Sequence, residues 1–342
     1  MNSRVWMWLT LFLLCASSLR AQDSDPASVP TLHVYTNLIQ IPVLVLRNDF
    51  TSFPLLAPSR FSISIDNAPV SKPTHVRLES EYPIQLALVF DTIAPVDDIL
   101  RATATAAAHL PGASLTPRDH LSVYTLGCTT ISRFAYNLPA DPEALTRVMG
   151  HVTDVQSRKR PNCKGAKPLW DALAVVASNL YQLPGRRVIL VVTNGFNSGS
   201  TRTSEALEEY AQGAGVAIFA FAPFDPAPVF GSARNPDNLA LDRLCQLTGG
   251  ILQSTLPGDI HARLPRFIQM LRGRYIVEFP RSRDATPGRH NLHVSIANLT
   301  GIILAAGDSV PIASQQEKEV PVLAPLDPET PAPPRSSAPP PI

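Results

Sequence analysis

The chain has 342 residues, of which 45% are hydrophobic, and its 34 prolines are about twice the usual share of about 5%. Its 29 Lys+Arg residues nearly balance its 28 Asp+Glu residues, which gives a formal net charge of +1. This balance argues against a dedicated nucleic-acid binder, and the apolar content argues against a wholly disordered chain. We therefore expect folded domains, with proline concentrated in one part.

The first 21 residues have the pattern of a secretory signal peptide. Arg4 supplies a positive charge, residues 5–15 are almost wholly apolar, and Ala21 stands where cleavage is expected. Such a run is too short to cross a bilayer comfortably, although a retained anchor is the alternative. We therefore expect an exported protein, periplasmic or extracellular, that meets a membrane only during export.

Residues 22–82 are predicted to form an N-terminal β segment. Residues 38–46 have the composition of a strand, and residues 60–65 alternate polar and apolar side chains before a turn at 66–67. Pro42 lacks the N–H that a central strand donates, so we expect the first of these strands at a sheet edge or at a strand start.

Residues 83–256 alternate between strands and helices. The continuous apolar runs at 86–90 and 187–193 are typical of strands buried on both faces. Further strands are expected at 121–126, 131–138, 216–222 and 251–254, and helices at 99–110, from Asp141 onward, and at 169–183, 203–212 and 236–248. This alternation predicts an α/β fold with a doubly wound, mainly parallel sheet and helices on both of its faces.

Residues 257–312 contain a last helix at 260–271 and then three more strands. Because β segments flank the α/β unit, we expect them to pair with each other, so that the α/β unit is inserted in an accessory β domain. Residues 313–342 are predicted to be a disordered tail, since 9 of the 22 residues from Pro321 onward are proline.

Several short stretches occur in an order and spacing that point to a known family. They are Thr36-Asn37-Leu38, the hairpin at 61–69, Leu169-Trp170-Asp171-Ala172-Leu173, residues 244–250 and residues 274–279. The layout resembles a von Willebrand factor A-type (VWA) domain. The whole chain, over roughly residues 31–306, resembles the exported, acidobacterial-type group of VWA-related proteins.

This resemblance implies a divalent metal at the carboxyl ends of the strands, held by a DxSxS motif, a threonine and a second aspartate. Such a metal takes a carboxylate from a partner protein. In this chain only Asp91 matches the pattern, because Ile93 and Pro95 stand at the serine positions, Lys167 at the threonine and Asn194 at the last aspartate. We therefore expect a degenerate site with no metal ion and no cofactor.

Lys167 suggests a replacement for the missing metal. Its ammonium could approach Asp91, because an opposite charge within about 4–6 Å relieves a partly buried carboxylate. The alternative is that Lys167 points to solvent and Asp91 only caps a loop. A basic loop precedes Lys167 and contains Arg158, Lys159, Arg160 and Lys164. It would either steer an acidic partner toward the sheet top or simply be a solvated loop.

Three cysteines remain once the signal peptide, with Cys15, is removed. Cys245 lies in a helical pattern and is expected to be a buried small hydrophobe. Cys128 and Cys163 lie in turn-rich segments near the predicted sheet top, so we expect a disulfide between them that pins the basic loop.

Motifs of catalysis are absent from the sequence. It contains no Gly-x-Ser-x-Gly elbow, no Gly-x-Gly-x-x-Gly after the first buried strand and no phosphate-binding loop. We therefore expect a non-enzymatic, exported module that binds another protein through the sheet top or the basic loop, without nucleic acid. The alternative is a structural or scaffold protein of the envelope that makes its contacts through the β domain or the Pro-rich tail.

Overall fold

The computed structural model describes residues 38–306 apart from residues 67, 80–81, 95, 129–130, 158–165, 224–235 and 281–290. The predicted signal peptide and the predicted Pro-rich tail lie outside the described residues, so both stay predictions. Where the structure describes the chain, no helix combines the length and the apolar character needed to cross a membrane.

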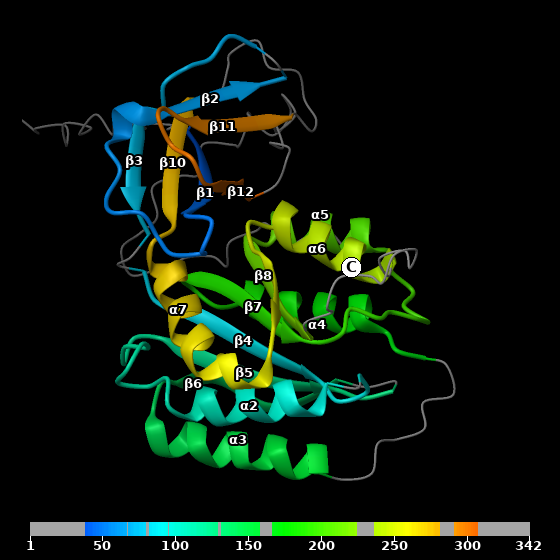
Figure 1. Cartoon of the computed structure of the whole chain (residues 1–342). Coiled ribbons are helices and arrows are strands. Elements are labelled where there is room, and N and C mark those ends of the chain that lie inside the picture. The colour runs from blue at the N-terminus through cyan, green and yellow to red at the C-terminus, as the bar shows by residue number, and fades with distance from the viewer. Residues whose placement is uncertain are drawn as a thin grey trace, which may run out of the picture. The chain divides into compact units, whose positions relative to one another are not determined.

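A six-stranded sheet forms the centre of the α/β part (Figure 1). Its strands are β4 (Ile84–Asp91), β5 (His120–Leu126), β6 (Ile131–Pro139), β7 (Arg186–Val192), β8 (Val216–Pro223) and β9 (Leu252–Thr255), in the order β6-β5-β4-β7-β8-β9. Only β6 is antiparallel to its neighbour. Because the order grows outward on both sides of β4, the sheet is doubly wound, and the predicted fold class is confirmed.

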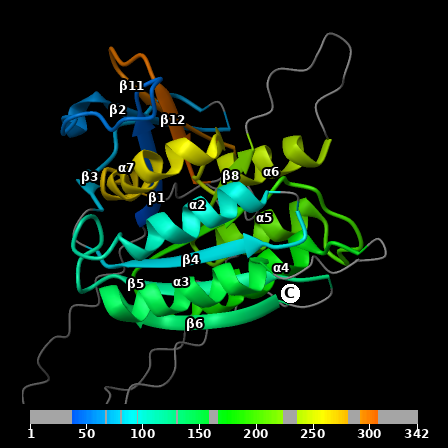
Figure 2. The same cartoon turned by 60° about the horizontal axis from the view of Figure 1, so that its bottom comes forward.

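Helices cover both faces of this sheet. One core cluster joins α2 (Asp97–Ala108), α3 (Pro142–Ser157) and α7 (Ile260–Arg272) to alternate residues of β4 and β7. The other joins α4 (Leu169–Tyr181), α5 (Ser204–Gly213) and α6 (Pro236–Leu247) to the residues between them. Successive side chains of a strand point to opposite faces, so strands covered on both sides are apolar throughout, and all eight residues of β4 are buried. Figure 2 shows these layers from a second side.

The segments before and after the α/β part pair with each other. One antiparallel sheet has the order β12-β1-β10-β3, and a second pairs β11 with β2. Their bounds are β1 (Leu38–Leu46), β2 (Phe61–Ile65), β3 (His75–Leu78), β10 (Tyr275–Pro280), β11 (Leu292–Ile296) and β12 (Ile302–Ala305), with short 3-10 helices η1 (Pro58–Arg60) and η2 (Pro257–Asp259). These sheets share a separate core cluster, so the predicted accessory β domain with an inserted α/β unit is confirmed.

The expectation that Pro42 places this strand at a sheet edge or marks a strand start is wrong, because Pro42 is in the middle of β1. β1 lies between β10 and β12, and Pro42 is paired with Ile276 of β10. β12 pairs only with residues 43–46 of β1, and the Pro42 carbonyl accepts a hydrogen bond from the Ala306 N–H. The N–H that Pro42 lacks would therefore face the end of the β12 ladder, where its loss removes little.

Asp119 joins several elements at the amino ends of the strands. Its side chain is fully buried and accepts hydrogen bonds from the Ile84 N–H at 2.8 Å and the Thr116 N–H at 2.6 Å. It also accepts one from the Thr116 hydroxyl at 2.8 Å and forms an ion pair with Arg272 at the end of α7. Burial alone raises the pKa of Asp119, but these donors outweigh it and hold the pKa below its ordinary value.

Replacing Asp119 should destabilise the fold in a pH-dependent way. Asp119→Ala should lower the free energy of unfolding by about 2–4 kcal/mol, because it leaves Arg272 and the buried N–H of Ile84 without their partner. Since the pKa is lower in the folded state, the carboxylate's contribution is present above its unfolded pKa and is lost as the pH falls through the folded pKa.

Denaturant unfolding of the wild type and of Asp119→Asn, measured from pH 7 down to pH 2, checks this sign. The Asn variant should lose less stability on acidification than the wild type. A suitable control is Asp98→Ala, because the Asp98 side chain is 78% exposed and pairs with Arg101 on the surface of α2. Equal losses for Asp119→Ala and Asp98→Ala would contradict the prediction.

Candidate binding face at the carboxyl ends of the strands

Asp91 and Thr193 meet at one edge of the sheet. Asp91 is the last residue of β4, and Thr193 directly follows β7. β4 and β7 are parallel neighbours, so their carboxyl ends lie side by side. The exposed fraction is 1% for Asp91 and 0% for Thr193, so both polar side chains are buried.

Groups of the chain itself occupy both carboxylate oxygens of Asp91. Its Oδ1 accepts hydrogen bonds from the backbone N–H groups of Ile93 and Ala94, each at 3.1 Å. Its Oδ2 accepts one from the Thr193 hydroxyl at 2.6 Å, and that hydroxyl in turn accepts one from the Gly195 N–H at 3.1 Å. The carboxylate therefore closes the loop after β4 and fastens it to β7.

Burial is the largest influence on the pKa of Asp91. It raises the pKa of Asp91 above its ordinary value, while the Thr193 hydroxyl, the two N–H groups and the charge of Lys167 lower it by less. The Asp91 carboxylate is thus held by neutral donors, whereas Asp119 has an arginine beside it.

Lys167 lies near this face, yet it does not form the direct ion pair with Asp91 that the sequence suggested. Its ammonium lies over the ring of Phe196, 4.9 Å from the ring centroid, in a cation–π contact. Within the described part of the chain, no ion pair joins Lys167 to Asp91. The reason is that Thr193 and two N–H groups already satisfy the carboxylate, and Lys167 acts on its pKa only through its charge.

Asn194 shapes the turn that presents Phe196. Its Oδ1 accepts a hydrogen bond from the Phe196 N–H at 3.2 Å, and Gly195 has a φ of +78°, a conformation that favours glycine. The Phe196 ring is 38% exposed. Sequence reasoning singled out Asn194 but missed Thr193 and Phe196. A hydroxyl at a buried strand end and an aromatic residue after an Asn-Gly turn were the available signals.

Residues 194–203, which we call the closing loop, are tied to the start of α4. Backbone hydrogen bonds join Lys167 and Ser198 in both directions, at 2.6 and 2.9 Å. Asp171 accepts hydrogen bonds from the Thr201 N–H at 2.8 Å and from the Arg202 N–H and guanidinium at 3.1 Å each. These donors outweigh the effect of burial and lower the pKa of Asp171.

The first N–H groups of α4 are satisfied by the same loop. The Ser200 hydroxyl accepts a hydrogen bond from the Trp170 N–H at 3.2 Å, and it donates one to Asn197 at 2.5 Å. A free helix N-terminus would offer these N–H groups to an external anion. Here the closing loop takes that place.

These residues do not fit the divalent metal that the family resemblance implies. Magnesium needs several accessible hard oxygen ligands in near-octahedral geometry. The oxygens of Asp91 and Thr193 are buried and hydrogen-bonded to each other, and Ile93 is a buried apolar side chain. Nor do three His, Cys, Asp or Glu side chains gather in a metal-binding group anywhere in the described ranges.

Several of the predicted site residues lie outside the described residues. These are Pro95, Arg158, Lys159, Arg160, Cys163 and Lys164. Cys128 is half-buried just after β5, and the predicted bridge from Cys128 to Cys163 stays a prediction. Cys245 is fully buried in α6, as expected of a small hydrophobic residue. Burial raises the pKa of its thiol.

No protein-family model matches the chain, and no curated protein does either. Among solved structures, the chain is similar to BatB from Bacteroides thetaiotaomicron, with 13% identity, a TM-score of 0.39 and coverage of 55% of this chain and 98% of BatB.

Two further similar structures have comparable scores. One is an aerotolerance-related membrane protein from Bacteroides fragilis NCTC 9343, with 12% identity, a TM-score of 0.40 and coverage of 55% of this chain and 98% of the other. The second is the VWA domain of SpRpn10, with 11% identity, a TM-score of 0.37 and coverage of 54% and 96%. One of these structures thus carries the domain type that the sequence resembles, and none of them assigns a function to this chain.

The buried carboxylate of Asp91 should make stability depend on pH with a sign opposite to that of Asp119. Because its pKa is raised in the folded state, stability should fall as the pH rises from the ordinary carboxyl pKa through the folded pKa. Asp91→Asn keeps the acceptor for the two N–H groups and removes the charge. The free energy of unfolding of this variant, minus that of the wild type, should therefore increase as the pH rises.

Denaturant unfolding of both proteins between pH 3.5 and pH 8 measures this difference. Asp119→Asn serves as the matched control, since its difference from the wild type should decrease with rising pH, in the acidic range. A decrease for Asp91→Asn over the same pH range would contradict the assignment.

Proposed function

We propose that this protein is an exported, non-enzymatic module that binds another protein through the carboxyl-end face of its sheet, without a metal ion. The observation that carries the proposal is that the Asp91 carboxylate is buried and hydrogen-bonded within the chain, while Phe196, which is 38% exposed, contacts the half-buried Lys167. Groups buried at the sheet top serve the fold, and the groups that face solvent serve recognition.

Metal independence is supported by the hydrogen bonds of Asp91. A metal ion would have to displace the Thr193 hydroxyl and two backbone N–H groups from a side chain that is 1% exposed. Those N–H groups would then be buried without a partner, which is costly.

Lys167 and Phe196 offer a contact of mixed character. A partly exposed aromatic ring beside a cation supplies apolar area and charge at one point, and aromatic side chains are enriched at protein interfaces. A partner with a carboxylate next to an apolar side chain would complement this pair. The predicted basic loop, Arg158, Lys159, Arg160 and Lys164, adds positive charge directly before Lys167 in the sequence and would speed the approach of an acidic partner.

Two further parts of the proposal come from the sequence. Export is supported by the signal-like first 21 residues, and a disulfide between Cys128 and Cys163 would suit an oxidising compartment and hold the basic loop near the end of β5. The lack of catalytic motifs supports a binding role rather than an enzymatic one.

The proposal is tested by cross-linking capture from the native cell envelope, with the tagged protein as bait and captured proteins quantified by mass spectrometry. A specific partner should be captured equally in magnesium and in EDTA. Phe196→Ala should reduce its capture about tenfold, the effect of removing one interface anchor worth about 1.4 kcal/mol.

Tyr136→Ala is the matched control. Tyr136 is also 38% exposed, and Arg133 lies over its ring at 4.9 Å, yet this pair belongs to β6 and not to the proposed face. Capture that is lost in EDTA, or that falls equally in both variants, would contradict the proposal. Loss of capture after truncation beyond Ala313 would instead favour a scaffold role through the Pro-rich tail.

A further inference from the structure

Two connections join the accessory β domain to the inserted α/β unit. The first runs from the end of β3 at Leu78 to the start of β4 at Ile84, and the second from the end of α7 at Arg272 to the start of β10 at Tyr275. Any change in the angle between the two parts has to turn both connections. The groups that hold the connections therefore decide whether the β domain can move.

A direct tie joins the two connections to each other. The Glu79 N–H donates a hydrogen bond to the Arg274 carbonyl at 2.8 Å, and the Glu79 carboxylate forms an ion pair with the Arg274 guanidinium. Both side chains are buried, so solvent screens the pair little. The connections therefore run side by side where they leave the β domain.

Arg186 reaches this junction from the central sheet. It is the first residue of β7 and is 2% exposed. Its guanidinium donates one hydrogen bond to the Leu271 carbonyl in the last turn of α7, at 2.6 Å, and another to the Tyr82 carbonyl in the first connection, at 2.8 Å. Its backbone N–H donates to the Pro83 carbonyl at 2.9 Å. One residue thus holds the first connection, the end of α7 and the sheet together.

The guanidinium of Arg186 keeps its charge in this buried position. Burial lowers its pKa to about 10, while the negative charges of Glu79 and Asp119 raise it and the nearby arginines lower it further. The side chain is therefore still positive at neutral pH. Hydrogen bonds from a charged donor are stronger than neutral ones, and breaking them would leave a buried charge without partners. Movement of either carbonyl away from Arg186 is therefore opposed.

The shape of the arginine side chain suits this role. A guanidinium is planar and presents its N–H groups in a rigid fork, so it can donate to carbonyls of two different segments at once. A lysine ammonium is a single point charge on a flexible stem. We therefore expect a lysine at position 186 to keep the charge without keeping the bridge.

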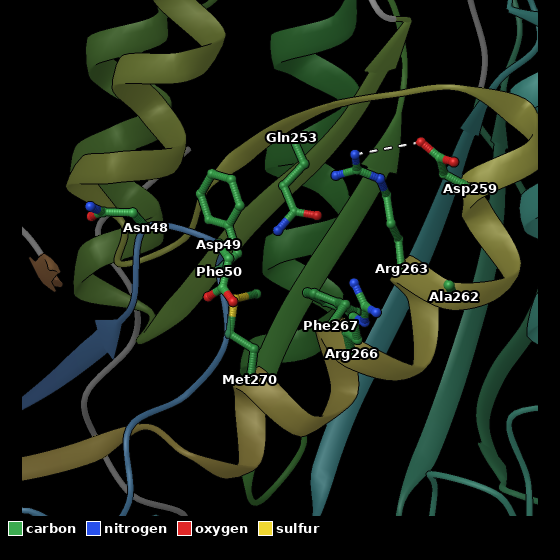
Figure 3. A pocket seen from close by; sticks show the side chains of 10 residues that line it. All are labelled: Asn48, Asp49, Phe50, Gln253, Asp259, Ala262, Arg263, Arg266, Phe267 and Met270. Atoms are coloured by element: carbon green, nitrogen blue, oxygen red, sulfur yellow. Dashed lines mark ion pairs between the residues drawn. The ribbon is translucent and has the colours of Figure 1, made fainter.

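Apolar packing at the junction does not by itself fix the angle. Leu44 and Leu46 of β1 pack into the core of the α/β unit, but hydrophobic contacts have no preferred direction. In addition, a pocket of about 490 Å³ lies between the turn that contains Phe50, after β1, and the helix α7 (Figure 3). The β domain therefore has space on this side into which it could tilt.

We propose that Arg186 is a lock that fixes the angle of the accessory β domain against the α/β unit. While its guanidinium bridges the Tyr82 and Leu271 carbonyls, the two connections cannot turn separately. When the bridge is lost, the β domain samples a range of angles. This inference does not depend on the proposed protein contact at the sheet top.

Double electron–electron resonance on the folded protein tests the lock. Nitroxide labels are attached to p-acetylphenylalanine at two exposed positions, Val70 in the β domain and Val175 on α4, so that the native cysteines stay unmodified. The wild type should give one narrow distribution of distances between the labels. Arg186→Met should lose this narrow peak and give a broad distribution, because it removes the bridge and keeps much of the side-chain stem.

Arg187→Met is the matched control. Arg187 is the next residue of β7 and is half-buried, and its guanidinium also donates to two carbonyls. These are the carbonyls of Leu183 and Ala214, each at 2.9 Å, and both belong to the α/β unit. Both methionine variants should therefore unfold at a lower denaturant concentration than the wild type, but Arg187→Met should keep the narrow peak.

Arg186→Lys is the second test variant, because it keeps the buried charge and removes only the fork. It should also lose the narrow peak. A narrow peak in either Arg186 variant would overturn the proposal and leave the apolar contacts as the cause of the fixed angle. Equal broadening in Arg186→Met and Arg187→Met would also overturn it, since general loosening of the fold would then explain the result.

Discussion

The hydrogen bond from the Thr193 hydroxyl to Asp91 limits which groups at the sheet top are available to a ligand. It joins the ends of two central strands, and with two N–H groups of the following loop it consumes the carboxylate that a ligand would otherwise use. In the proposed function, recognition therefore comes from groups farther out. The ties of the closing loop to α4 hold the exposed Phe196 beside Lys167.

Two buried aspartates at opposite ends of the sheet show how surroundings decide what a carboxylate does. Asp119 has an arginine and three further hydrogen bonds, and its pKa is lowered. Asp91 has only neutral donors in contact, and burial raises its pKa. The negative charge of Asp119 thus stabilises the junction of β4, β5 and α7. The negative charge of Asp91 lowers stability instead, and the hydrogen bonds that its oxygens accept are what hold the loop after β4.

Much of the fold could be predicted from local patterns. Continuous apolar runs identified the doubly covered strands β4 and β7, and Asp141 and Thr203 were recognisable at helix starts, where each accepts a backbone hydrogen bond. That the two β segments pair with each other followed from their positions around the α/β unit, and β1 pairs with β10. The expectation for Pro42 was wrong because proline removes a hydrogen bond on only one side of its strand. In β1 that side faces the end of the short strand β12.

The candidate site was harder to predict, because it depends on competition between donors. The sequence placed Asp91 and Lys167 near each other, but it did not reveal that Thr193 satisfies the first and Phe196 attracts the second.

If the chain's own groups close the sheet top, Mg²⁺ should find no site at Asp91. Calorimetric titration of the folded protein with Mg²⁺, after dialysis against EDTA, measures this. We expect no saturable heat and the same unfolding midpoint with and without the ion. Saturable one-to-one binding that disappears in Asp91→Asn would contradict the account.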